Sequence, residues 1–267
     1  MVKIAFLFLF ISGINHVQHW HDFFKGHQDS YSIYVHAKTP LNTDSFFTTY
    51  TPVDTVKTSW ANTMKAQIVL LKKALEDPTN EKFIFVSDAT IPLHDFNTVY
   101  SRCLYYKESM FYYMPNPHIN PGSEFLHYHQ TERDLQPIAR NKQFKNWQWI
   151  ILNRKHAQLM VEDRYYLPII SQYPCDNEHY PSTFLINKGL IDEIIPQDTT
   201  YVEWRKPRDN YDSPYTFTNL NNNDELSLLL KAQKLGFLFA RKLDKTCDLT
   251  PLNRYLPYRT EYKVTTH

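Results

Sequence analysis

Residues 173–183 are the stretch of the chain best suited to chemistry, because they place two acids and a histidine between prolines, directly after a helical pattern. A carboxylate on a short turn that faces a cleft can be kept partly dry and can take a proton from a bound hydroxyl. Glu178 is therefore the candidate general base. The same residues allow a purely structural interpretation, in which Asp176 or Asn177 caps the following helix and Glu178 is a first-turn acid favoured by the helix dipole.

Positive charge that could hold a phosphate group occurs at Arg241 and Lys242, just after the apolar residues 237–240. A guanidinium fork and a mobile ammonium both match phosphate oxygens. A basic pair after a strand can equally be a solvated edge of the fold. The chain has no Asp-x-Asp pair, through which nucleotide-sugar enzymes usually hold a divalent ion, and Asp88 is an isolated acid. We therefore expect a diphosphate to be held without a metal ion.

Several other kinds of site lack their sequence signals. The histidines at positions 16, 19 and 21, and those at 127 and 129, have no third or fourth ligand at the spacing that zinc needs. The chain has no G-x-S-x-G elbow, no Walker loop and no G-x-G-x-x-G motif, and it contains only five glycines. Serine hydrolase, P-loop and Rossmann dehydrogenase chemistry therefore have no anchor in this sequence.

Composition narrows the choice of partners. In 267 residues, Lys and Arg number 29 and Asp and Glu 28, so no broad basic field exists to hold a nucleic acid. Aromatic residues make up 15% of the chain, and their flat faces suit a cleft that binds sugars. The three cysteines are widely spaced and are expected to be reduced thiols. Residues 4–11 are too short to span a bilayer and lack a cleavage site, and no Asn-x-Ser/Thr acceptor occurs, so we expect a cytoplasmic or otherwise soluble protein without a transmembrane segment.

The elements that must position these residues follow an alternating pattern. Apolar runs at 2–10 and 83–86 predict buried strands of a parallel sheet, and a helix at 16–25 leads from the first run to a strand at 31–36. Asp88 then lies at the carboxyl edge of the sheet, where open α/β folds bind their ligands. The sequence predicts an α/β domain over residues 2–250 and a C-terminal tail over 251–267.

Further elements are predicted around this core. Helical spacing indicates helices at 58–75, 95–106 and 154–171 and one that begins after the asparagines at 221–223 and ends at Gly236, with strands at 109–114, 147–152 and 200–204. Residues 115–141 show little periodicity and are expected to form a long surface loop, which in a compact domain is usually functional or mobile.

Taken in order, several stretches resemble the core-2/I-branching β-1,6-N-acetylglucosaminyltransferase family, especially its plant-type branch. They are residues 23–27 (FFKGH), 31–37 (YSIYVHA), 59–60 (SW), 75–83 (LEDPTNEKF), 87–93 (SDATIPL), 149–157 (WIILNRKHA), 175–180 (CDNEHY) and 239–242 (FARK). The resemblance covers most of residues 2–243, and the ordered series is far more specific than any single block.

The resemblance implies a single GT-A-like domain and an inverting, metal-independent reaction with a UDP-sugar donor. It places Glu178 on the family's catalytic base and Lys242, with Arg241 beside it, on the residues that replace the metal at the diphosphate. A second diphosphate-binding arginine of the family has no secure counterpart here, although Arg205 and Arg208 lie nearby in the sequence. The membrane anchor, the stem and the paired cysteines common in Golgi members of the family are missing from this chain, so residence in the Golgi lumen does not carry over.

The predicted function is therefore transfer of N-acetylglucosamine or a related sugar from a UDP-sugar to a hydroxyl of a glycan acceptor, with no cofactor. We assign Asp88 and His36 to the donor side, and Trp149 and Trp204 to the acceptor side. A carbohydrate-binding protein that has lost turnover is the alternative, and a hydrolase is a weaker one. Geometry separates these cases, because a catalytic Glu178 must face the same cleft as the basic pair.

Overall fold

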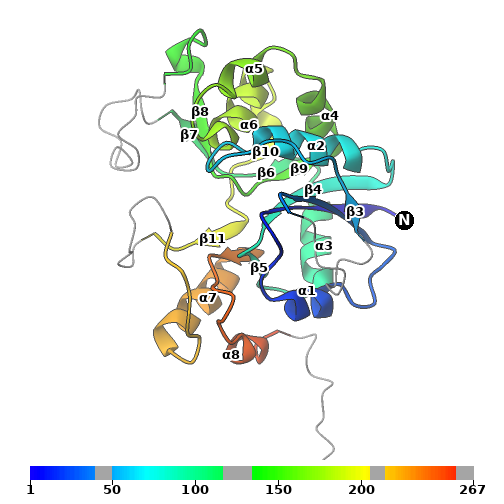
Figure 1. The fold of residues 1–267 in the computed structure, drawn as a ribbon, viewed down its shortest axis with the longest axis vertical. Helices are drawn as coiled ribbons and strands as arrows, with labels where there is room; N and C mark the ends of the chain where they lie inside the picture. Colours follow the sequence, from blue (N-terminus) through cyan, green and yellow to red (C-terminus); the bar gives the residue numbers. More distant parts are fainter. Residues whose placement is uncertain (40–49, 117–133, 205–213, 257–267) are drawn as a thin grey trace, which may run out of the picture.

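The computed structural model describes residues 1–39, 50–116, 134–204 and 214–256, which form an α/β fold built on a seven-stranded, mostly parallel sheet (Figure 1). The strand order is β10-β6-β9-β4-β1-β2-β3. The strands are β1 (Lys3–Phe10), β2 (Tyr31–Ala37), β3 (Thr51–Pro52), β4 (Asn80–Ser87), β6 (Ser109–Met110), β9 (Ile151–Asn153) and β10 (Ile194–Ile195). Only β9 pairs antiparallel with its neighbours, so the predicted GT-A-like α/β architecture with a mostly parallel sheet is confirmed.

Helices cover both faces of this sheet. Figure 1 shows α2, α4, α5 and α6 above the sheet and α1 and α3 below it. Their bounds are α1 (Val17–Phe24), α2 (Met64–Ala74), α3 (Phe96–Tyr105), α4 (Arg154–Glu162), α5 (Tyr166–Ile170) and α6 (Asp176–Asn187). Two short 3₁₀ turns, Arg140–Lys142 and Ile191–Glu193, connect elements of the upper layer.

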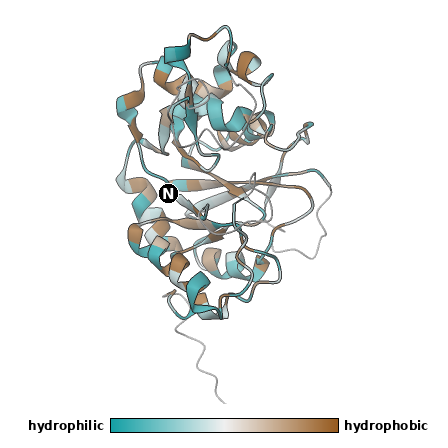
Figure 2. Ribbon diagram, turned by 90° about the vertical axis from the view of Figure 1, so that its left-hand side faces the viewer, coloured by the Kyte–Doolittle hydropathy of each residue, from teal (hydrophilic) through white to brown (hydrophobic). Residues whose placement is uncertain are grey.

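Alternation along the central strands creates two separate cores. In β1, Ala5 and Leu7 face the upper helices, while Phe6 and Phe8 pack on α1 and its Trp20. The central strands are buried on both faces, which explains why their sequences are continuously apolar rather than alternating. Brown and teal segments alternate along the helices that cover the sheet in Figure 2, as expected for helices with one buried side.

A second, smaller unit carries the basic pair. A three-stranded sheet joins β11 (Thr200–Val202), β12 (Phe239–Arg241) and β5 (Ile91–Pro92). Two helices, α7 (Asn223–Leu235) and α8 (Thr250–Asn253), pack with it in a third hydrophobic cluster. Leu252 of α8 is fully buried there, so the packed structure extends past the predicted boundary at residue 250. The division into a domain and a tail stays a prediction for residues 257–267, which lie outside the described residues.

Two predicted helices differ from the structure. The helix expected at 58–75 begins only at Met64, because residues before it form a turn in which Ala61 has a φ of 61°. The helix expected at 154–171 is two helices, α4 and α5, because the Asp163 carboxylate accepts backbone N–H bonds at the start of α5 and ends the first helix. The strand expected at 109–114 is divided into β6 and β7 (Tyr113–Pro115), and β7 pairs antiparallel with β8 (Phe144–Asn146).

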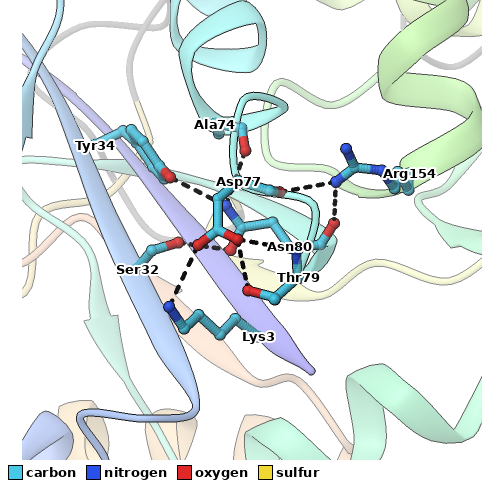
Figure 3. Close-up of polar contacts among 8 residues, drawn as sticks. All are labelled: Lys3, Ser32, Tyr34, Ala74, Asp77, Thr79, Asn80 and Arg154. Carbon is cyan, nitrogen blue, oxygen red and sulfur yellow. Dashed lines mark hydrogen bonds and ion pairs between the residues drawn. The ribbon is translucent and has the colours of Figure 1, made fainter. Parts of the chain in front are cut away.

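The edge of the sheet where β1, β2 and β4 begin is fixed by a polar cluster around Asn80 (Figure 3). The fully buried Asn80 amide donates to the Tyr34 hydroxyl and to the Ala74 carbonyl, and its oxygen accepts from Ser32. Arg154 donates to the carbonyls of Asp77 and Asn80 close by. These bonds tie the α2–β4 loop and the start of α4 to the sheet, and they lie at the edge opposite the carboxyl ends of β1 and β4.

Other predictions concern residues that the structure does not describe. Most of the predicted loop at 115–141, Arg205 and Arg208, and the histidines at 127 and 129 fall wholly or largely outside the described residues. Within the described part of the chain, no helix combines the length and apolar character that crossing a bilayer requires. The three cysteines are buried and none of them is in a disulfide, in agreement with the expected reduced thiols.

Candidate active site

A cleft of about 460 Å³ opens at the carboxyl ends of β1 and β4. The start of α6, the segment around β8 and β9, and the end of β12 complete its walls. Six of the seven predicted site residues line this one cleft: Asp88, Trp149, Glu178, Trp204, Arg241 and Lys242. The condition set for a catalytic Glu178, a shared cleft with the basic pair, is therefore met.

His36 is the predicted site residue that the cleft does not include. Its side chain is fully buried in β2, and its Nε2 accepts the backbone N–H of Val56 at 3.0 Å. Burial lowers the pKa of His36, which favours the neutral ring that this hydrogen bond requires. The geometry thus gives His36 a place in the packing of β2, and its assignment to the donor has no support from this arrangement.

Glu178 lies in the first turn of α6, so the predicted proline-bounded turn is in fact a helix that contains Pro181. The N-cap residue is Cys175, in the left-handed conformation with a φ of 58° and without a side-chain cap bond. The Asp176 carboxylate reaches a different helix, since its Oδ1 accepts the backbone N–H groups of Thr63 and Met64 at the start of α2. The capping interpretation is therefore right about the chemistry of Asp176 but names the wrong helix.

Asn146 of β8 completes α6 where Pro181 interrupts it. Pro181 has no N–H, so the carbonyl of Asn177 loses its helical partner and accepts instead from the Asn146 side chain at 3.2 Å. The Asn146 oxygen in turn accepts the backbone N–H of Ser182 at 3.1 Å. One amide side chain thus satisfies helix groups on either side of the proline, within one turn of Glu178.

Lys145 precedes Asn146 and reaches Glu178 directly. Its Nζ lies 3.1 Å from Glu178 Oε2, and the two side chains are 7% and 23% exposed. The ammonium also lies 5.6 Å from the centre of the Trp147 ring. Sequence reasoning missed Lys145 because it expected a strand at 147–152 and did not predict β8. The alternation of Lys145, Trp147 and Trp149 was the signal available for it.

Arg241 at the end of β12 is held against Trp149. The guanidinium carbon lies 4.2 Å from the centre of the Trp149 ring, which is 8% exposed. Burial lowers the pKa of Arg241 to about 10, and the charges of Asp88 and Glu178 oppose this shift, so the group remains a cation at neutral pH. Its buried Nε–H has no hydrogen-bond partner among the described residues. Arg241 also lines the cleft, and a cation at this position is suited to an anionic ligand.

The aromatic walls of the cleft have two different arrangements. Trp147 and Trp204 stack at 6.1 Å between ring centres, with an angle of 28° between their planes. Trp149, in contrast, is covered by the guanidinium of Arg241. Both Trp149 and Trp204 were assigned to the acceptor, but this packing makes Trp149 a support for the arginine and leaves Trp147 and Trp204 as the stacked aromatic pair of the cleft.

The described residues contain no group of three or more His, Cys, Asp or Glu side chains arranged to hold a metal ion. Asp88 follows β4, and its Oδ1 accepts the backbone N–H of Ala89. Within the described residues, the charged groups at the cleft are two carboxylates, Asp88 and Glu178, and the cations of Lys38, Lys145, Arg241 and Lys242. Because the cationic side chains outnumber the carboxylates, the cleft is better suited to an anionic ligand than to a metal cation.

An α/β domain of GT-A-like architecture, with a carboxylate, a basic pair and stacked tryptophans at the carboxyl edge of its sheet, has the features of a glycosyltransferase. The sequence model of the Core-2/I-Branching enzyme family matches residues 4–226, and the chain belongs to this family. It is 29% identical over 237 residues to the glycosyltransferase BC10 of Oryza sativa subsp. japonica. The aligned region covers 76% of this chain and 57% of that relative. Glu178 falls within the family match, whereas Arg241 and Lys242 lie beyond it.

Proposed function

We propose that this protein is an inverting, metal-independent glycosyltransferase that moves a sugar from a UDP-sugar to a hydroxyl of a glycan acceptor. The observation that carries the proposal is the cleft that Glu178 shares with the basic pair Arg241 and Lys242. A surface cap and a solvated basic edge would have no reason to face each other. The family membership supports the reaction class, and the donor and mechanism are part of the proposal.

The reaction would proceed by a single displacement. Glu178 takes the proton of the acceptor hydroxyl while the acceptor oxygen forms a bond to the anomeric carbon. The bond from this carbon to the β-phosphate oxygen breaks on the opposite side, and its electron pair leaves with UDP. Arg241 and Lys242 stabilise the negative charge that develops on the leaving group, a kind of interaction worth a few kcal/mol per donor.

The proposal omits a metal ion because of the charges at the cleft. Mg²⁺ or Mn²⁺ at a diphosphate needs carboxylates to fix it against both phosphates, and Asp88 is one isolated acid at the donor side. The preorganised cations of Arg241 and Lys242 neutralise the same charge. Arg241 is particularly suited to this role because its guanidinium is already oriented by the ring of Trp149.

The proposal names the donor sugar and the acceptor only by class. The family resemblance suggests N-acetylglucosamine, and the UDP derivatives of xylose, glucose and glucuronic acid are the other donors to test. UDP release measured with each UDP-sugar, with and without candidate glycan acceptors, identifies the pair. A carbohydrate-binding protein without turnover would bind members of the panel but release UDP with none of them.

The test of the mechanism is Glu178→Gln, compared with Glu162→Gln on the exposed surface of α4. We expect Glu178→Gln to keep its UDP affinity and to lower turnover on the order of a hundredfold or more, as for loss of a general base. The Glu162 control should behave as the unchanged protein. Near-normal turnover in Glu178→Gln would refute the assignment of the base.

A further inference from the structure

The ion pair between Lys145 and Glu178 is the feature of the cleft that the proposed mechanism does not use. Lys145 is nearly buried, at 7% side-chain exposure, and its Nζ lies 3.1 Å from one of the two carboxylate oxygens, Oε2. Within the described part of the chain, the Glu178 side chain has no ion-pair or hydrogen-bond partner other than Lys145. The carboxylate is therefore held on one side and open on the other.

The backbone around Lys145 leaves its ammonium little freedom to move away. Phe144 exchanges two hydrogen bonds with the Thr183 hydroxyl, one through its N–H and one through its carbonyl. Asn146 bonds to α6 on both sides of Pro181, as described above. Lys145 lies between these two attachments, so β8 and the first turns of α6 form one unit in which ammonium and carboxylate face each other.

A carboxylate on a side chain with three rotatable bonds samples many orientations, and a general base works only in those that reach the proton. An ion pair to one oxygen favours the orientations in which this oxygen stays beside the ammonium, and it thereby restricts where the other oxygen can point. A lysine that bound the donor phosphates would be expected to lie beside Arg241 and Lys242. The ammonium of Lys145 instead forms an ion pair with the proposed base.

We propose that Lys145 is a positioning residue for the reaction: it holds Glu178 through Oε2 so that Oε1 faces the acceptor hydroxyl. This inference rests on the proposed role of Glu178 as the base. Lys145 itself touches neither substrate and takes up no proton. Its removal should therefore lower turnover without weakening the binding of the nucleotide.

The experiment compares Lys145→Met, Glu178→Gln and the double variant, with Lys188→Met at the end of α6 as a control of the same substitution type. We expect Lys145→Met to lower kcat by about tenfold to a hundredfold while the dissociation constant for UDP changes less than about twofold. In the Glu178→Gln background the same substitution should cost less than about twofold, because the group it positions is gone. The control should retain normal kcat.

A loss of activity in Lys145→Met could also result from misfolding, and restoring the charge chemically distinguishes the two causes. Lys145→Cys treated with 2-bromoethylamine carries an ammonium at nearly the original distance, and the native cysteines are each less than 5% exposed. We expect alkylation to return most of the lost kcat, whereas the unchanged protein treated in the same way should keep its activity. Recovery of this kind requires the charge itself and not merely a folded chain.

The possible outcomes separate this inference from the proposed function. If Glu178→Gln is fully active, the proposed base is wrong. If Glu178→Gln is inactive but Lys145→Met has normal kcat, only the positioning role is wrong. Weakened UDP binding in Lys145→Met, multiplicative losses in the double variant, or no recovery on alkylation would each overturn the positioning role as well.

Discussion

Replacing Asp176 by Asn should stabilise the protein at neutral pH, although the residue makes two hydrogen bonds. Asp176 is 3% exposed, and burial raises the pKa of its carboxyl group to about 6, against the opposing effect of the N–H groups of Met64 and Thr63. The charge is therefore costly in the folded state. Asparagine keeps the oxygen that accepts these bonds and removes the charge.

The magnitude follows from the two pKa values of Asp176. A carboxyl that ionises near pH 6 in the folded chain and near 3.8 in the unfolded chain loses roughly 3 kcal/mol of stability when ionised, at about 1.4 kcal/mol per pH unit. The stabilising contribution is complete below about pH 4 and is lost as the pH rises through 6. The advantage of Asp176→Asn should therefore grow from about zero near pH 4 to at most about 3 kcal/mol at pH 8.

Urea denaturation of both proteins at pH 4.5, 6 and 8 measures this difference. Any constant cost of fitting the new amide group cancels between pH values, so the quantity to compare is the change of the stability difference with pH.

Asp95→Asn is a control of opposite sign: burial raises the pKa of Asp95, but hydrogen bonds from Thr98 outweigh it and lower the pKa overall. That variant should lose stability at neutral pH, and less so as the pH falls. A pH-independent difference for Asp176→Asn, or a deficit that grows with pH, would refute the reasoning.

Three further predictions test the donor and acceptor sides of the cleft. Lys242→Ala should weaken UDP binding and slow turnover together, because the same charge holds the bound diphosphate and the leaving group. Unchanged UDP affinity by calorimetry would mean that Lys242 is a solvated surface residue without a role in donor binding. Trp149→Leu should weaken UDP binding by about tenfold through loss of the support for Arg241, whereas Trp204→Leu should raise the KM of the acceptor. The assignment fails if Trp149→Leu affects only the acceptor. Transfer should survive excess EDTA, and loss of activity that Mn²⁺ restores would instead identify Asp88 as a metal ligand.

The strands of the central sheet could be predicted because they are buried on both faces. A strand with two apolar faces needs a continuous apolar run, and residues 2–10 and 83–86 provide it. The error at 58–75 has a tertiary cause. Trp60 has helical spacing with the later residues, yet it is 68% exposed in a turn at the cleft. Asn62 of this turn bonds to the backbone of Tyr173 and Cys175, more than a hundred residues away, and these contacts override the local pattern.

The candidate site could be predicted only in part, for a similar reason. Glu178 and the pair at 241–242 were found because each lies in a recognisable block of sequence. Lys145 could not be assigned to Glu178, because only the packing of β8 on α6 joins residues 33 positions apart. His36 was assigned to the donor side, but its side chain is buried away from the cleft, and its Nε2 accepts the backbone N–H of Val56.

The segment that carries Glu178 departs from local structural preferences three times within seven residues. Cys175 has a positive φ, Asp176 is a buried acid, and Pro181 interrupts a helix. Each departure is compensated from another element: Asn62 accepts the N–H of Cys175, the start of α2 donates to Asp176, and Asn146 replaces the helical bonds lost at Pro181. Local conflicts of this kind cluster at functional sites and persist only where the surrounding structure fixes them. The position of Glu178 is thus determined by α2 and β8 on either side of it, and not by the helical propensity of α6.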